Sequence, residues 1–176
     1  GHTELLARLT GTRRFAMMLF GDRIRVVLAT RHLPLRKVAD ALTPDAIVEA
    51  VEMLARALPW MGFRRARIGV CGLNPHAGDG GALGDEEKTI IAPALVRCRK
   101  RGWNVAGPIP ADAIFHQHLA GTFDAVVAMY HDQGLAPMKM LSFESGVNLT
   151  LGLPIVRTSP DHGTASDLAG PNQANP

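Results

Sequence analysis

Four histidines occupy similar places in the sequence, each after a short apolar segment typical of a strand. They are His32, His76, His131 and His162. Because ligands of open α/β sheets bind outside the carboxyl ends of the strands, we expect these side chains near such an edge. Converging imidazoles would form a site for a divalent ion such as Zn²⁺. A lone histidine after a strand is usually a loop residue bonded to nearby backbone, and the spacing matches no C-x-x-C or H-E-x-x-H signature. The pattern alone leaves both interpretations open.

Other polar groups follow the same apolar segments. The glycine-rich loop 73–84 precedes a helical pattern and could cradle a phosphate, although it is neither a G-x-G-x-x-G nor a Walker A loop. Lys139 and Arg157 could hold a phosphate or carboxylate, or they could be ordinary solvated charges. Asp112 follows Pro110 and could simply cap a helix.

The elements that must position these residues alternate between strands and helices from Arg67 onward, which predicts an α/β fold with a largely parallel sheet. Gly21-Asp22 predicts a hairpin turn, and Thr43-Pro44 predicts the start of a helix. Strands are expected at 15–20, 24–29, 67–72, 103–105, 123–130, 147–151 and 155–158. Helices are expected at 35–41, 45–58, 85–101 and 111–119, and the segment after 135 shows no clear pattern.

Composition excludes several classes of protein. The length of 176 residues suggests one domain, or one with part of another, and the net charge of +3 gives no basic stripe for nucleic acid. No apolar run approaches the ~18 residues that span a bilayer, and no segment resembles a secretory signal. Cys71 and Cys98 are expected to be buried free thiols in a reducing compartment. We therefore expect a cytoplasmic protein with no nucleic-acid or membrane partner.

Four long segments carry a resemblance to a known family: CGLNPHAG at 71–78, AMYHDQG at 128–134, GVNLTLGLP at 146–154 and RTSPDHGTA at 157–165. They closely resemble the 4-hydroxythreonine-4-phosphate dehydrogenase family of vitamin B6 (pyridoxal phosphate) synthesis, and the resemblance covers nearly the whole chain. It implies the isocitrate/isopropylmalate dehydrogenase-like fold, with three α/β/α layers.

The resemblance also implies how the chain is organised. Residues 1–140 would form the second domain of the family, which binds metal and dimerises. Residues 141–176 would return to a first domain whose N-terminal part is missing. Members of the family are homodimers with the active site at the subunit interface.

Site residues follow from the same resemblance, position by position. The implied metal ligands are His32, His76 and His131. The implied substrate contacts are His2, Thr3, Lys139, Asn148 and Arg157, and the implied catalytic residues are Lys139 and Asp112. The loop that would receive the adenosine of NAD or NADP is Asp161, His162, Gly163 and Thr164.

The implied reaction oxidises the secondary alcohol of 4-phosphohydroxy-L-threonine with NAD(P)⁺, followed by decarboxylation. A divalent metal (Zn, Mg or Co) would act as a Lewis acid, and Lys139 or Asp112 would handle the hydroxyl proton. Two alternatives stay open. Relatives act on four-carbon sugar-acid phosphates or on terephthalate dihydrodiols, and a truncated chain could be an inactive dimerisation or metal-binding module.

Overall fold

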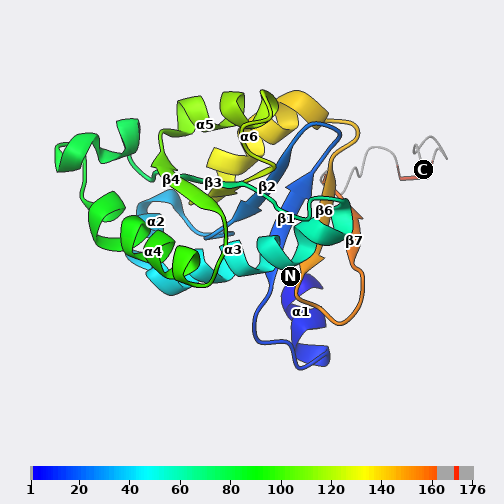
Figure 1. Ribbon diagram of the computed structural model, residues 1–176. Coiled ribbons are helices and arrows are strands. Elements are labelled where there is room, and N and C mark those ends of the chain that lie inside the picture. The colour runs from blue at the N-terminus through cyan, green and yellow to red at the C-terminus, as the bar shows by residue number, and fades with distance from the viewer. Residues whose placement is uncertain (1, 162–168, 171–176) are drawn as a thin grey trace.

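The computed structural model describes residues 2–161 and 169–170, and within these residues the strands form one seven-stranded sheet (Figure 1). The strand order is β4-β3-β5-β2-β1-β6-β7. The strands are β1 Ala16–Phe20, β2 Arg25–Leu28, β3 Ile68–Cys71, β4 Val105–Ile109, β5 Ala125–Ala128, β6 Val147–Leu151 and β7 Thr158–Pro160.

Four neighbouring strands, β4, β3, β5 and β2, run parallel to one another. The other three continue the sheet in antiparallel pairs, β2 with β1, β1 with β6 and β6 with β7. The residues of β3 and β5 are all buried, which is typical of parallel strands covered on both faces. The predicted α/β class with a largely parallel sheet is confirmed.

Helices cover both faces of the sheet. Figure 1 shows α5 and α6 on one side and α3 and α4 on the other. The α-helices are α1 His2–Leu9, α2 Val38–Ala41, α3 Pro44–Ala57, α4 Ala92–Lys100, α5 Ala111–Leu119 and α6 His131–Ser142. Short 3₁₀ turns lie at Leu35–Lys37, Leu58–Met61 and Pro75–Gly81, and a π-helical turn at Glu87–Ile91 precedes α4.

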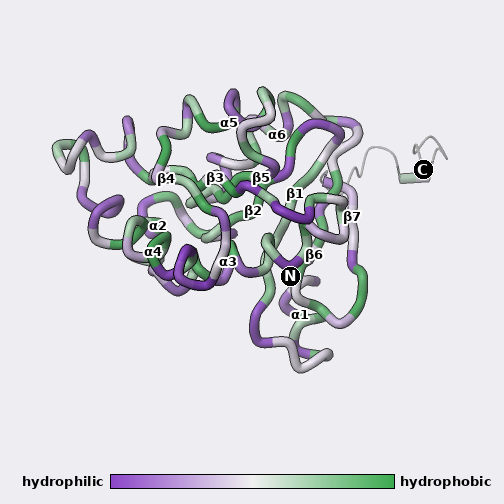
Figure 2. The backbone as a smooth tube through the Cα atoms, viewed as in Figure 1, coloured by the Kyte–Doolittle hydropathy of each residue, from purple (hydrophilic) through white to green (hydrophobic). Residues whose placement is uncertain are grey.

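The hydrophobic core lies between these layers, where Figure 2 shows apolar segments along the central strands. Both cysteines are buried and free, as expected. The predicted hairpin forms, with Met18 opposite Val27. Thr43 caps α3, since its side-chain oxygen accepts a hydrogen bond from the amide of Ala46 at 3.2 Å.

Besides α1, which the sequence pattern did not indicate, three segments differ from the sequence prediction. Residues 131–142 form α6, which the pattern did not indicate because Gly134 and Pro137 disfavour a helix. Tertiary packing overrides that preference: a Cβ at Gly134 would meet the Leu28 side chain at 2.8 Å and that of Val26 at 3.1 Å, so glycine allows the close approach of the helix to β2. The sequence predicts a strand at 103–105 and a loop at 107–110, but β4 covers Val105–Ile109 and so includes most of the expected loop. The sequence also predicts a strand at 155–158, but β7 begins only at Thr158. As an edge strand, β4 tolerates Pro108.

The domain boundary predicted at residue 140 stays a prediction. Strand β6, which follows this position in the sequence, pairs with β1 in the same sheet. Among the described residues, no helix has both the length and the apolar character needed to cross a membrane.

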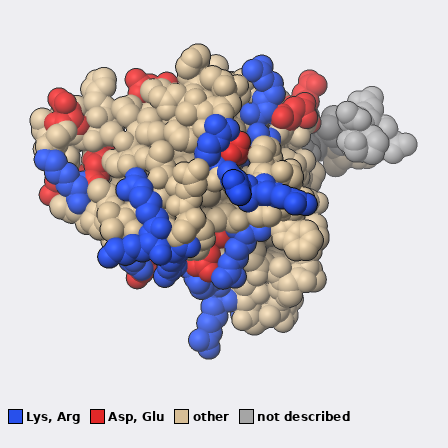
Figure 3. All heavy atoms as spheres, in the orientation of Figure 1, with Lys and Arg blue, Asp and Glu red and all other residues tan. Residues whose placement is uncertain are grey.

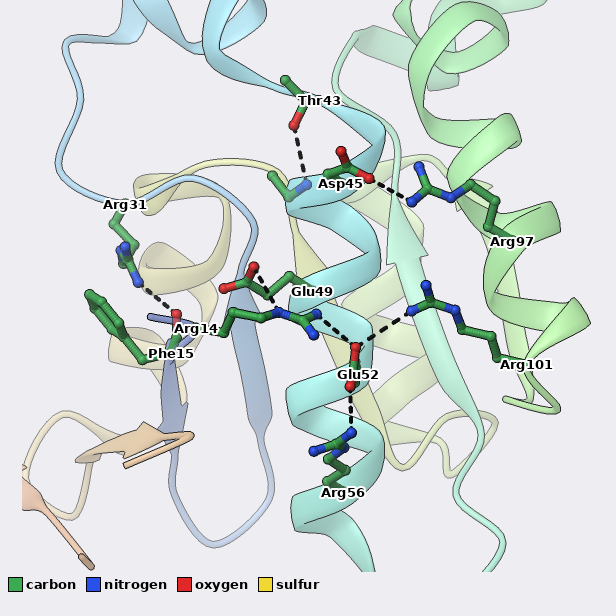
Figure 4. A network of polar contacts seen from close by, with 11 residues as sticks. Arg14, Phe15, Arg31, Thr43, Asp45, Glu49, Glu52, Arg56, Arg97 and Arg101 are labelled. Atoms are coloured by element: carbon green, nitrogen blue, oxygen red, sulfur yellow. Dashed lines mark hydrogen bonds and ion pairs between the residues drawn. The ribbon is translucent and has the colours of Figure 1, made fainter. Parts of the chain in front are cut away.

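A buried carboxylate holds α3 to its neighbours (Figure 4). Glu52 on α3 is only 5% exposed, and it pairs with Arg14 at 2.7 Å, Arg56 at 2.6 Å and Arg101 at 3.5 Å. Figure 3 shows several cationic side chains along the lower side of the molecule. Because the carboxylate is compensated by three guanidinium groups, its burial is tolerated.

A buried histidine joins α5 to the sheet at the amino end of β2. His118 is 3% exposed, its Nε2 accepts a hydrogen bond from the amide of Arg25 at 3.1 Å, and its Nδ1 donates to the carbonyl of Phe123 at 2.8 Å. Burial, the largest effect, lowers the pKa of His118, and nearby Arg25 lowers it further, against the opposing effects of Phe123 and Asp124. The ring is therefore held neutral.

We expect His118 to make stability depend on pH. Its pKa is lowered in the folded state, so its contribution is complete above about pH 6.5 and is lost as the pH falls through the lowered value. His118→Gln should cost about 1–3 kcal/mol of unfolding free energy near neutral pH, with the difference from wild type shrinking in acid. Urea unfolding of the full-length protein measures this. His116→Gln on the same helix is the control, and a pH-independent difference would contradict the assignment.

Candidate functional site at the carboxyl edge of the parallel strands

The three histidines expected to bind metal follow three strands that are neighbours in the sheet. His32 follows β2, His131 follows β5, and His76 follows β3, which pairs with β5 on its other side. Because these strands are parallel, their carboxyl ends lie at one edge of the sheet. We call this the histidine edge.

His32 and His131 lie close together there. Their ring centroids are 5.3 Å apart with the planes inclined by 45°. The two segments are tied by Thr30, whose hydroxyl donates to the carbonyl of Met129 at 2.7 Å. Nδ1 of His131 is bonded to the carboxylate of Asp132 at 2.7 Å, which leaves Nε2 available as a ligand atom.

His76 lies on the exposed turn after β3 and does not join that pair. Within the described ranges, no three histidine, cysteine, aspartate or glutamate side chains converge as a metal site would require. Two facing imidazoles nevertheless suit a borderline ion such as Zn²⁺ or Co²⁺, for which nitrogen ligands are preferred. One chain therefore supplies two of the nitrogen ligands that a Zn²⁺ or Co²⁺ site would need.

Sequence reasoning missed the polar residues that hold these loops. Gln133 is 8% exposed; its Oε1 accepts from the amide of Met129 at 2.7 Å and its Nε2 donates to the carbonyl of Gly72 at 2.8 Å. It thereby joins the end of β3 to the start of α6. Its place two residues after His131 was the available signal, but the sequence does not reveal its distant partner.

Lys139 lies away from the histidines. It is eight residues beyond His131 on α6, a rise of about 12 Å. Its ammonium group pairs with the Asp161 carboxylate at 3.0 Å, donates to the Asp161 carbonyl and lies 5.1 Å from the Phe143 ring centroid. Asp161 follows β7. Across β6 and β1, the register places Pro160 of β7 in line with Arg25, the first residue of β2, so Asp161 lies near the amino end of that parallel strand. The structure thus joins a predicted substrate residue to a predicted cofactor residue.

Asn148 and Arg157 lie on or beside β6 and β7. Asn148 pairs in register with Leu19 and Ser159, and its Oδ1 is buried without a hydrogen-bond partner in the described structure. Arg157 donates to the hydroxyl of Thr150 at 3.3 Å. A buried carbonyl oxygen without a partner is uncommon in folded proteins and leaves Oδ1 able to accept a hydrogen bond.

The remaining predicted residues are spread out. Asp112 is exposed in the first turn of α5, which follows β4 at the histidine edge. His2 and Thr3 begin α1, a helix the sequence pattern did not indicate. His162, Gly163 and Thr164 lie outside the described residues. A groove of about 840 Å³ between the end of α3 and residues 149–156 contains none of the predicted site residues in its lining.

The fold and this edge define a class: α/β proteins that bind ligands beyond the carboxyl ends of parallel strands. Residues 1–176 match the profile of the family described as "Pyridoxal phosphate biosynthetic protein PdxA". The chain belongs to this family, which confirms the resemblance seen in the sequence.

Similar proteins are about twice as long as this chain. A protein of Desulfosudis oleivorans named 4-hydroxythreonine-4-phosphate dehydrogenase is 53% identical over 99% of this chain and 52% of its own length. A D-threonate 4-phosphate dehydrogenase of Pectobacterium atrosepticum is 48% identical over 100% of this chain and 54% of its own. The crystal structure of 4-hydroxythreonine-4-phosphate dehydrogenase from Klebsiella pneumoniae superposes with a TM-score of 0.92 at 48% identity, covering 99% of this chain and 53% of that one. The chain thus spans about half the length of these relatives.

Replacing Gln133 should destabilise the protein. Gln133→Leu would leave the buried amide of Met129 and the carbonyl of Gly72 unpaired, at about 1–3 kcal/mol each. Urea unfolding of the full-length protein would report the loss. Gln117→Leu on α5 is the control, with an expected change within about 0.5 kcal/mol, and equal losses in the two variants would contradict the bridging role.

Proposed function

We propose that the full-length protein is an NAD(P)-dependent dehydrogenase that oxidises 4-phosphohydroxy-L-threonine to 2-amino-3-oxo-4-phosphooxybutanoate, which then decarboxylates, in pyridoxal 5'-phosphate synthesis. The family and the names of relatives at about 50% identity support this activity. The observation that carries it on this chain is the facing pair of His32 and His131 at the edge where α/β proteins bind ligands. We place the protein in the cytoplasm.

We propose that His32, His76 and His131 hold a divalent metal in a homodimer, with residues 1–140 as the metal-binding and dimerising part. His32 and His131 face each other within one chain, whereas His76 is exposed on a separate turn. This arrangement supports a site shared between subunits, in which His76 comes from the partner. When bound, Zn²⁺, Mg²⁺ or Co²⁺ would supply Lewis acidity at the substrate hydroxyl.

The other residues of the chain would bind and orient the substrate. Arg157 and Lys139 would neutralise its phosphate or carboxylate, and the orphaned Oδ1 of Asn148 would accept a hydrogen bond from it. Lys139 would exchange its partner Asp161 for the substrate anion. Asp112 or Lys139 would take the hydroxyl proton at its carboxylate or amine. His2 and Thr3 would add substrate contacts, and the loop 161–164 would receive the adenosine of the cofactor.

A second substrate class also has support. The Pectobacterium relative, at 48% identity, is named for D-threonate 4-phosphate. That compound and 4-phosphohydroxy-L-threonine are both four-carbon hydroxy acids carrying a terminal phosphate, so the same cations would bind either one. Comparing kcat/KM for the two substrates on one preparation separates these alternatives.

Turnover should require a metal. The full-length protein with 4-phosphohydroxy-L-threonine and NAD(P)⁺ should form NAD(P)H, a chelator should abolish the reaction, and an added divalent ion should restore it. Absorbance of NAD(P)H measures this. A folded protein that turns over only D-threonate 4-phosphate would reassign the substrate, and turnover unaffected by chelation would contradict the metal site.

Mixing two inactive variants should restore activity if the site is shared. His76→Ala and His131→Ala should each lose metal and activity, whereas a heterodimer of the two would keep one intact site. The matched control mixes His32→Ala with His131→Ala. Because His32 and His131 of one chain serve the same site, every site in this mixture lacks one ligand, and the mixture should stay inactive. Activity is measured after subunit exchange. No recovery in the first mixture would place all three histidines on one subunit.

A further inference from the structure

The turn that carries His76 has an unusual backbone. Six consecutive residues, 76–81, have positive φ, including 52° at His76, 52° at Ala77 and 42° at Asp79. A left-handed conformation costs a residue with a Cβ roughly 1–2 kcal/mol. Such a turn persists only where its surroundings hold it, and strained backbone of this kind clusters at functional sites.

Glu87, from the π-helical turn before α4, holds the entry to this segment. Its carboxylate accepts hydrogen bonds from the amide of Leu73 at 2.7 Å, from the amide of Asn74 at 2.8 Å and from the side chain of Asn74 at 3.0 Å. The residue is 4% exposed, so these donors replace its water. The bonds fix the two residues that lead into the turn.

The turn also wraps closely around this carboxylate. A Cβ at Gly78 would lie 2.6 Å from Oε2 of Glu87, and one at Gly72 would lie 3.1 Å from Oε1. The next residue, Lys88, donates from its ammonium group to the carbonyl of Gly80 at the far end of the turn. Adjacent side chains of one π-helical turn therefore hold both ends of the segment, and π-helical turns are frequent at functional sites.

The charge of Glu87 is retained despite its burial. Burial, the largest effect, raises the pKa of this carboxyl, but hydrogen bonds from Asn74, its own backbone and Leu73 together outweigh burial and lower the pKa. An ionised carboxylate only accepts hydrogen bonds, and its three partners here, the amides of Leu73 and Asn74 and the Asn74 side chain, all donate. Glutamine has nearly the same shape as glutamate but replaces one carboxylate oxygen with an NH₂ group, which cannot accept a hydrogen bond from these donors.

We propose that Glu87 and Lys88 are positioning residues that hold the left-handed turn and thereby present His76 to the metal. The inference rests on the proposed function, since it takes His76 as a ligand. Neither residue touches the metal or the substrate in this role. Groups that orient a ligand in this way typically change metal affinity by 10–100-fold when they are replaced.

Co²⁺ binding to the full-length protein tests this role. Glu87→Gln should weaken Co²⁺ binding by about tenfold or more and change the visible absorption of the bound ion. Lys88→Met, at an exposed position, should weaken it by a smaller factor without loss of thermal stability. Titration followed by visible absorption, with thermal unfolding of the metal-free protein, provides both readouts.

Glu52→Gln is the matched control. Glu52 is a glutamate of similar burial, 5% against 4% exposed, and its partners are arginines on the α3 side of the sheet. It should lose stability but keep the affinity for Co²⁺. Unchanged affinity in both Glu87→Gln and Lys88→Met, or an equal loss in Glu52→Gln, would overturn the proposal while leaving the proposed function intact.

Failure of the proposed function would look different. If the wild-type dimer binds no Co²⁺, the metal site itself is wrong. In that case, amide hydrogen exchange over residues 73–81 tests separately whether Glu87 holds the left-handed turn. Faster exchange in Glu87→Gln than in Glu52→Gln would support it, and equal exchange would overturn it.

Discussion

The parallel pairing of β2, β5, β3 and β4 is the constraint on which the rest of the structure depends. Parallel strands need crossovers, and the crossovers here place helices on both faces and bury every residue of β3 and β5. The same pairing brings the carboxyl ends of separate strands to one edge. His32, His76 and His131, which lie far apart in sequence, reach a common edge for this reason alone.

Buried hydrogen bonds turn that shared edge into a defined geometry. Thr30 joins the segment after β2 to the segment after β5, and Gln133 joins the latter to the end of β3. Glu87 then fixes the turn that follows β3. Each of these groups is buried, so an unmade bond would carry its full desolvation cost. These bonds therefore tie the loops at the histidine edge to one another and to the sheet.

Helix α6 runs from the carboxyl ends of the parallel strands toward their amino ends. It begins at His131 on the histidine edge and carries Lys139 toward the side where Asp161 follows β7. Predicted metal ligands and the predicted anion-binding lysine are therefore separated within one chain. Relatives twice as long share this half of their fold, with a TM-score of 0.92 in the Klebsiella structure. A complete site in our proposal draws on a second subunit and on the rest of the longer protein.

The sequence by itself determined the α/β class, the hairpin at Gly21, the cap at Thr43, the helix at 111–119 and the family, because these depend on local pattern and on long motifs. It could not determine α6, since packing of Gly134 against Leu28 outweighs the poor helix preference of glycine and proline. Nor could it reveal that Gln133 reaches Gly72, or that Glu87 holds Asn74. Those partners are distant in sequence, and only the tertiary structure brings them within hydrogen-bonding distance.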